Sequence, residues 1–310
     1  MKHTLKVTAY LIVLFFIAQV VGLYIINQYI DHKKTSETGA VAWQSLPYNL
    51  ERPEVKNQSI SFIYIAVAIF IGTLFILLLI KFKKIFIWKL WFFVTVWLTL
   101  SIAFAAFVNS AIAAVLALTV SALKLWKPTI ILQNISEVFI YGGLAAIFVP
   151  MVNLFAAFML LIVISIYDFI AVFKTKHMVK LAKFQSESEV FAGLLIPYKK
   201  GKILVEAKKS QKSDTQKAQG QAAKLGHAHS VAVLGGGDIG FTLIFAGVVM
   251  KGLMLQEPVL TGFLKTLIIP FLVTITLFIL LIKGQQNKFY PAMPVLSLGC
   301  FVGYLVILLV

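Results

Sequence analysis

Long apolar runs recur from one end of this chain to the other, and they restrict its possible folds more than any other feature. A run of about 20 apolar residues is long enough to cross the hydrocarbon core of a bilayer as one helix. With 60% hydrophobic and only 13% charged residues, the chain is too apolar for a soluble domain of 310 residues. We therefore predict an all-α polytopic membrane protein with about nine transmembrane helices. The predicted spans are 5–27, 59–80, 85–107, 109–126, 128–150, 152–173, 229–250, 259–282 and 289–310.

The basic residues predict how these helices are oriented. Lys and Arg in short loops tend to stay on the cytoplasmic side of a membrane. With nine spans, 22 of the 28 Lys and Arg residues, Lys124 and Lys127 among them, fall on the side of the N-terminus, and five fall on the opposite side. We therefore predict a cytoplasmic N-terminus and an external C-terminus. Topology and attraction to anionic lipid explain the net charge of +16, and no nucleic-acid-binding motif accompanies it.

Polar segments divide the chain into three parts. Residues 1–173 hold the first six predicted transmembrane helices, 174–228 form a cytoplasmic loop, and 229–310 hold helices seven to nine. In the loop we expect an interfacial amphipathic piece over 174–198, a short extended segment "KILVEAK" over 202–208, and then a disordered tail. The external segment 28–58 carries mixed charge and ends in a glycosylation sequon at Asn57.

Three acidic residues remain inside predicted spans: Glu137, Asp168 and Asp238. A charged side chain in the hydrocarbon costs about 2.5 to 3.5 kcal/mol on insertion scales, so it usually faces the bundle interior and has a function. Asp168 lies six residues before Lys174 and Asp238 lies nine residues after His229. These separations correspond to about 9 Å and about 13 Å of helix. The two helices run in opposite directions, so both aspartates are expected at a similar depth in the cytoplasmic half, where they can be neighbours.

Two carboxyl groups that meet in a desolvated site hold one proton between them, which is the basis of aspartic-protease chemistry. The residues alone leave other interpretations open. The aspartates could be separate capping groups, could carry protons or cations in a transporter, or could belong to a chaperone or scaffold. The glycines of "GGGD" (235–238) could form a helix-packing groove, or a loosened backbone that makes room for a substrate beside Asp238.

Three motifs in the second half of the chain carry a resemblance to a known family. "YDFIAVF" (167–173) resembles the YD motif on the sixth helix of presenilins and signal peptide peptidases, and "GGGD" fits their GxGD motif on the seventh. "PAMP" (291–294) resembles their PAL motif, with Met293 where leucine is usual, and "KGKILVEAKKS" (200–210) is similar to the presenilin sequence after the sixth helix. The resemblance extends over 150–310; for the first five spans it rests on number and topology.

This resemblance implies an intramembrane aspartyl protease that cuts transmembrane helices of substrate proteins within the lipid bilayer. It implies Asp168 and Asp238 as the catalytic pair, and the orientation and compact loops indicate an archaeal presenilin homologue in the plasma membrane of a prokaryote. No metal or organic cofactor and no nucleic-acid partner are expected. The residues expected to contact substrate are Tyr167, Gly235, Gly236, Gly237, Pro291, Ala292 and Met293, with Leu204 and Val205 as a hypothetical edge strand.

Other chemistries find no support in the sequence. There is no His-Glu-x-x-His zinc motif, and every histidine lies in a predicted loop or tail, away from any intramembrane serine. We expect no strand ahead of "GGGDIG", so a nucleotide site is not predicted there. Glu137 is interpreted as a buried acid paired with Asn134 or a lysine, with an accessory proton or ion group as the alternative.

Overall fold

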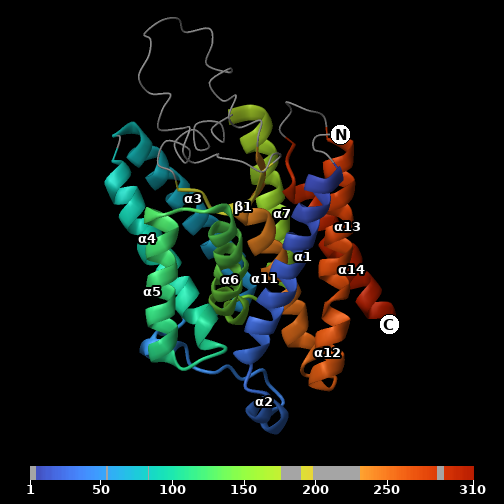
Figure 1. Cartoon of the computed structure of the whole chain (residues 1–310). Coiled ribbons are helices and arrows are strands. Elements are labelled where there is room, and N and C mark those ends of the chain that lie inside the picture. The colour runs from blue at the N-terminus through green and yellow to red at the C-terminus, as the bar shows by residue number, and fades with distance from the viewer. Residues whose placement is uncertain (1–4, 54, 83, 176–189, 198–230, 285–289) are drawn as a thin grey trace, which may run out of the picture.

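The computed structural model describes residues 5–53, 55–82, 84–175, 190–197, 231–284 and 290–310. These residues form a bundle of long helices with a two-stranded antiparallel sheet toward one end (Figure 1). The helices are α1 (Leu5–Gln28), α2 (His32–Thr38), α3 (Ser61–Lys81), α4 (Ile85–Ala105), α5 (Ser110–Trp126), α6 (Ile130–Phe148), α7 (Leu154–Ile170), α11 (Gly236–Leu253), α12 (Val259–Thr266), α13 (Ile268–Lys283) and α14 (Met293–Leu309). The strands are β1 (Gly193–Pro197) and β2 (Val231–Gly235).

The helical membrane fold predicted from the sequence is confirmed. Within the described ranges, seven helical segments are long and apolar enough to cross a membrane, and the other two predicted spans correspond to the shorter apolar helices α5 and α14. The eighth predicted span consists of α12 and α13, which meet at Leu267. Pro270 lies in the first turn of α13, and a proline has no N–H for the carbonyl of Thr266, so one helical hydrogen bond is missing near this point.

Asparagine side chains cap the second helix of each pair of helices that only a very short turn connects. Asn109 accepts hydrogen bonds from the N–H groups of Ala111 and Ile112 at the start of α5. Asn153 does the same for Ala156 at the start of α7. Each asparagine satisfies backbone donors that a helix start leaves without a partner. The two connections are therefore true helix boundaries and not kinks.

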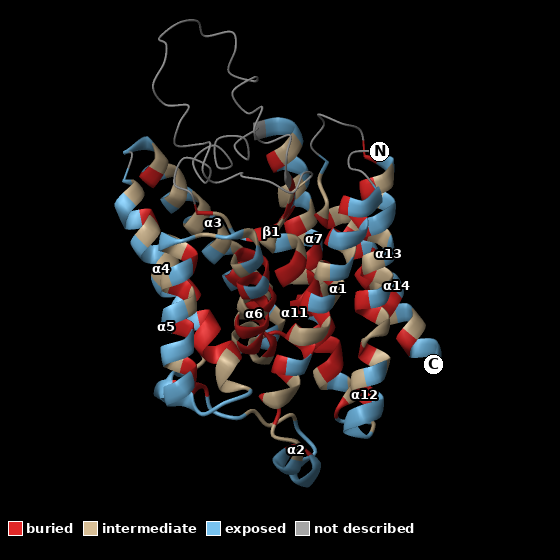
Figure 2. Ribbon diagram, viewed as in Figure 1, coloured by how far each residue is buried: buried red, intermediate tan, exposed pale blue. Residues whose placement is uncertain are grey.

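Two helices form the centre of the bundle (Figure 2). In the most apolar stretches of Ile130–Met151 and Gly236–Leu253, 61% of the residues are buried, compared with 11% in Gln58–Lys81. The central positions belong to α6 and α11, whereas α3 presents most of its side chains to the outside. A side chain on α6 or α11 is consequently held by neighbours on several sides.

Glycines let α6 approach its neighbours closely. A Cβ atom on Gly143 would lie 2.0 Å from the carbonyl oxygen of Thr99 on α4, and one on Gly142 would lie 3.2 Å from the Cα atom of Gly22 on α1. Small residues at such crossings allow backbone contact between helices in a membrane, where packing rather than hydrophobicity holds helices together.

Arg52 attaches the segment between α1 and α3 to the bundle. Its guanidinium donates to the carbonyl oxygens of Gln44 (2.8 Å) and Ala146 (3.4 Å) and lies 5.8 Å from the ring centroid of Tyr29. The hydroxyl of Tyr29 donates to the carbonyl oxygen of Ile102 at 2.7 Å. Burial raises the pKa of Tyr29 to about 12, so this hydroxyl stays a neutral donor.

Three expectations for the loop and the seventh span need correction. The seventh span does not begin at residue 229, because β2 precedes α11, which starts at Gly236. A strand therefore does lie ahead of "GGGDIG". The amphipathic piece expected over 174–198 is wrong for Gly193–Pro197, which forms β1. An apolar run such as "VAVL" is compatible with a strand as well as with the end of a helix. Here it forms a strand because it pairs with β1.

Gly143 gives a test of this packing. Because its added methyl group would meet backbone atoms of α4, Gly143→Ala should lower the free energy of unfolding by about 1 to 3 kcal/mol, the usual cost of overpacking. Gly72→Ala on α3 is the control, since a Cβ atom there would have no atom within 4 Å. Thermal unfolding in detergent should show a lower Tm for the first variant only. Equal Tm values for both variants would contradict the close α4–α6 contact.

Candidate active site

Asp168 and Asp238 lie on α7 and α11, two helices that pack against each other. Asp168 lies in the last turn of α7 and Asp238 in the first turn of α11. Both side chains are partly buried, and the charge of Asp168 acts directly on Asp238. The two carboxyl groups that the sequence predicts to be neighbours are thus close enough to interact electrostatically, and Asp238 follows the end of β2 by three residues.

The start of α14 holds Asp168. The backbone N–H of Met293 donates to Oδ2 of Asp168 at 3.1 Å, and the backbone of Ala292 contributes to the same carboxylate. The first N–H groups of a helix have no partner within that helix and favour negative charge. The "PAMP" segment therefore binds one of the two aspartates, a role that the sequence analysis did not assign to it. Below this contact, the hydroxyls of Ser165 and Ser297 lie 2.9 Å apart and join α7 to α14.

Tyr167 and Met293 point to other parts of the site. The Tyr167 hydroxyl lies 3.3 Å from Oγ1 of Thr73, so this side chain reaches toward α3. The Met293 side chain is buried in the main apolar cluster, whereas Pro291 and Ala292 are partly exposed. The part of this segment that contacts an aspartate is its backbone, through the N–H groups of Ala292 and Met293.

The three glycines form the junction between β2 and α11. Gly235 ends the strand and Gly236 begins the helix, so the run is not a loosened stretch within a helix, as one interpretation of the sequence proposed. A Cβ atom on Gly235 would lie 3.4 Å from Oδ2 of Asp238, and one on Gly236 would lie 2.3 Å from the hydroxyl oxygen of Tyr141. Gly237 is exposed. The first two glycines keep side chains away from Asp238 and Tyr141, whereas a Cβ atom on the third would make ordinary contact with the ring of Phe241, at 3.6 Å.

The sheet brings its end close to Asp238. Gly193 of β1 pairs with Gly235 of β2, and the N–H of Gly236 donates to the carbonyl oxygen of Ala192 at 3.3 Å. Gly193 has φ of +145°, a backbone conformation that side-chain-bearing residues rarely adopt. The strand pairing thus continues up to the first residue of α11, two positions before the acid.

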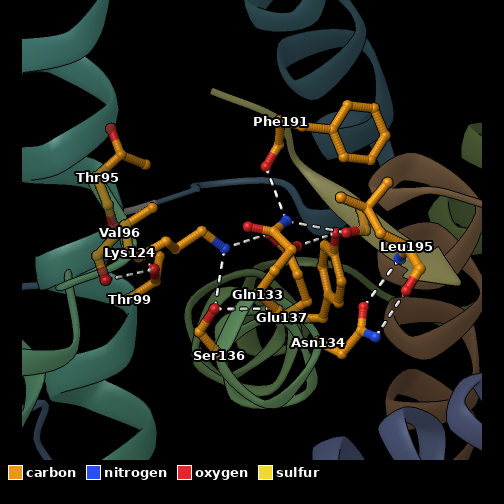
Figure 3. Close-up of polar contacts among 12 residues, drawn as sticks. Thr95, Val96, Thr99, Lys124, Gln133, Asn134, Ser136, Glu137, Phe191 and Leu195 are labelled. Carbon is orange, nitrogen blue, oxygen red and sulfur yellow. Dashed lines mark hydrogen bonds and ion pairs between the residues drawn. The ribbon is translucent and has the colours of Figure 1, made fainter. Parts of the chain in front are cut away.

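Amide side chains of α6 occupy the outer edge of β1 (Figure 3). Asn134 both donates to the carbonyl oxygen of Leu195 and accepts from its N–H, each at 2.8 Å. Gln133 donates to the carbonyl oxygens of Phe191 (2.9 Å) and Gly193 (3.0 Å). These contacts replace a neighbouring strand, so β1 is fixed to the central helix of the bundle.

Glu137 is paired with a lysine, as one interpretation of the sequence predicted. Lys124 Nζ lies 2.5 Å from Oε1 of Glu137, and both side chains are almost fully buried. Asn134, the other suggested partner, binds β1 instead. Lys124, which the sequence analysis counted among the basic residues on the side of the N-terminus, is therefore buried and not exposed. The predicted orientation does not depend on it, because 22 basic residues fall on that side and only five on the other.

Sequence analysis missed Gln133 and Tyr141, although a signal was present. Gln133, Glu137 and Tyr141 follow one another at intervals of four residues, which places them on one face of a helix. Among the described residues there is no group of three or more His, Cys, Asp or Glu side chains that could hold a metal ion. Leu204 and Val205 lie outside the described residues.

Fold and site together define a polytopic membrane protein with two partly buried carboxyl groups that interact electrostatically, one on α7 and one on α11. The sequence matches the family described as signal-peptide peptidase, presenilin aspartyl protease over residues 39–310. The chain belongs to this family. The resemblance drawn from its motifs is confirmed, and the protein is an intramembrane aspartic endopeptidase.

Solved structures with the same fold carry a related description. One, described as a presenilin family intramembrane aspartate protease in the C222 space group, shares 18% identity over 96% of this chain and 99% of that chain, with a TM-score of 0.54. Another, with the same description in the P2 space group, shares 18% identity over 96% of each chain, with a TM-score of 0.56. At this identity the likeness shows the fold alone. No curated protein matches the sequence.

Proposed function

We propose that Asp168 and Asp238 are the catalytic pair with which this protein hydrolyses peptide bonds within or near the transmembrane helices of substrate proteins. The observation that carries the proposal is the meeting of these two carboxyl groups, from α7 and α11, inside a membrane bundle. Family membership supports the reaction type.

The chemistry requires only the two carboxyl groups and a water molecule. One carboxylate accepts a proton from the water, whose oxygen attacks the peptide carbonyl carbon, while the protonated carboxyl donates its proton to the carbonyl oxygen. The resulting gem-diol then collapses, the peptide nitrogen takes a proton, and the C–N bond breaks. The pair begins and ends the cycle with one shared proton.

The open edge of β2 is the proposed docking place for an unwound substrate. Because both backbone groups of Leu195 bond to Asn134, they point away from β2, and Leu195 and Val233 form a non-hydrogen-bonded pair. The N–H and C=O groups of Val233 then face the outer edge of β2, where the described part of the chain supplies no partner. A substrate strand added there would satisfy its own backbone and run toward Asp238.

The proposed orientation places the active site in the cytoplasmic half of the membrane. The excess of Lys and Arg residues on the side of the N-terminus supports this assignment. The compact loops support an origin in the plasma membrane of a prokaryote, where such a chain would act on single-span proteins.

The first test is cleavage of a reporter transmembrane peptide by the purified protein. Asp168→Asn and Asp238→Asn should each lower the rate by at least about 1,000-fold, because each variant removes one member of a pair that acts as a unit. An aspartyl protease inhibitor that mimics the transition state should block the wild type. A wild type that never cleaves but carries ion or solute flux in liposomes would contradict the proposal and favour a transporter.

The second test locates the substrate strand with photo-crosslinking residues. A crosslinker in place of Val233 should capture the reporter peptide, whereas one in place of Leu195, on the strand already occupied by Asn134, should not. Crosslinkers at Leu204 and Val205 test the edge strand expected there from the sequence, and an absence of contact would remove that role. Capture at position 195 but not at 233 would show that the substrate does not add to β2.

A further inference from the structure

The ion pair of Glu137 and Lys124 is buried near the junction of β2 and α11 and has no part in the hydrolysis described above. The two residues are 1% and 4% exposed. Lys124 also donates to the hydroxyl of Ser136 at 3.0 Å. Burying two charges is costly unless both are paired and hydrogen-bonded, and replacing such a pair by apolar residues is often neutral or stabilising. Stability alone therefore does not account for this pair.

One contact of Glu137 leads to the helix that carries Asp238. The Tyr141 hydroxyl donates to Oε2 of Glu137, one helical turn away on α6. That same hydroxyl lies at the position where a side chain on Gly236 would begin, and Tyr141 is within electrostatic range of Asp238. The carboxylate thus fixes the direction of a side chain that packs against the first residue of α11.

A second contact of Glu137 leads to the sheet. The side-chain nitrogen of Gln133 lies 3.0 Å from Oε1 of Glu137 and also within hydrogen-bond distance of the carbonyl oxygens of Phe191 and Gly193, so its two hydrogens serve three acceptors and one hydrogen is shared. Gly193 pairs with Gly235, the last residue of β2. Both contacts of Glu137 therefore reach the same junction, one through β1 and the other through Tyr141.

The contacts leave Glu137 little capacity for another task. Oε1 accepts from Lys124 and Gln133, and Oε2 accepts from Tyr141. Three donors occupy most of the acceptor sites of this carboxylate and hold both of its oxygens in place, so it is set up to fix geometry.

We propose that Glu137, neutralised by Lys124, is a positioning residue for the active site. Through Tyr141 and Gln133 it sets the β2–α11 junction and hence the place of Asp238 relative to Asp168. This inference rests on the proposed function of the two aspartates. It assigns no chemical step to Glu137, and it identifies Tyr141 as the side chain through which the ion pair reaches the junction.

Tyr141→Phe is the decisive variant, because it removes only the hydroxyl between Glu137 and Gly236. With the purified full-length protein and the reporter peptide, kcat should fall about 10-fold while KM changes less than about twofold, since small displacements of a catalytic group reduce kcat strongly. Amide hydrogen exchange over 190–197 and 231–240 should accelerate in the same variant. That second readout does not require cleavage.

Tyr29→Phe is the matched control, because it also removes a buried tyrosine hydroxyl that is hydrogen-bonded, there to the carbonyl oxygen of Ile102 on α4. It should lower Tm by a similar amount and leave both kcat and exchange over 231–240 unchanged. An unchanged kcat or unchanged exchange in Tyr141→Phe, or equal losses in Tyr29→Phe, would overturn the inference. A wild type that fails to cleave would refute the proposed function instead, and the exchange data would still decide this point.

A charge-neutral replacement separates geometry from charge. Glu137→Gln alone leaves the Lys124 ammonium buried without a counter-charge, and kcat should fall at least about 10-fold. Adding Lys124→Met should restore part of kcat, raising it at least about threefold over Glu137→Gln, because the amide oxygen of the glutamine can still accept from Tyr141 although its NH2 group cannot accept from Gln133. Failure of the double variant to recover, with its Tm intact, would show that the charge itself is required and would contradict a positioning role.

Discussion

A carboxyl group inside a membrane needs partners supplied by the protein, and three such groups organise this fold. Asp168 accepts from the backbone at the start of α14, Glu137 is neutralised by Lys124, and Asp238 has another acid, Asp168, acting on it. The first two acids have donors that stabilise a charge. Asp238 has another acid as its neighbour. A gain in stability does not explain this arrangement, whereas the sharing of one proton between two carboxyl groups does.

The sheet connects this arrangement to the protease reaction. A substrate helix that is to be cut must unwind, and each of its freed backbone groups then needs a hydrogen-bond partner away from water. Asn134 and Gln133 of α6 occupy the outer edge of β1, and among the residues that the structure describes no strand pairs with the outer edge of β2. Because β2 continues directly into α11, a peptide aligned with that edge would be directed toward the proposed catalytic pair.

Much of this could be predicted from the sequence, for physical reasons. The spans follow from apolar run length, and the meeting of Asp168 with Asp238 follows from equal depth on antiparallel helices. The β2 strand was missed because "VAVL" is apolar enough to extend a membrane helix, and only its pairing with distant Gly193–Pro197 distinguishes the two. The burial of Lys124 was hidden for a similar reason, since its partner lies on another helix. The repeat of Gln133, Glu137 and Tyr141 on one face of α6 was visible and indicated a polar stripe inside the bundle.

The dependence of the cleavage rate on pH tests the central claim most directly. If Asp168 and Asp238 work with one proton between them, kcat/KM for the reporter peptide should follow a bell-shaped curve. It should fall on the acid side as the pair gains a second proton and on the alkaline side as it loses the one it has. Each limb should approach about a tenfold change per pH unit. A rate that stays constant across the titration of both groups would contradict the account.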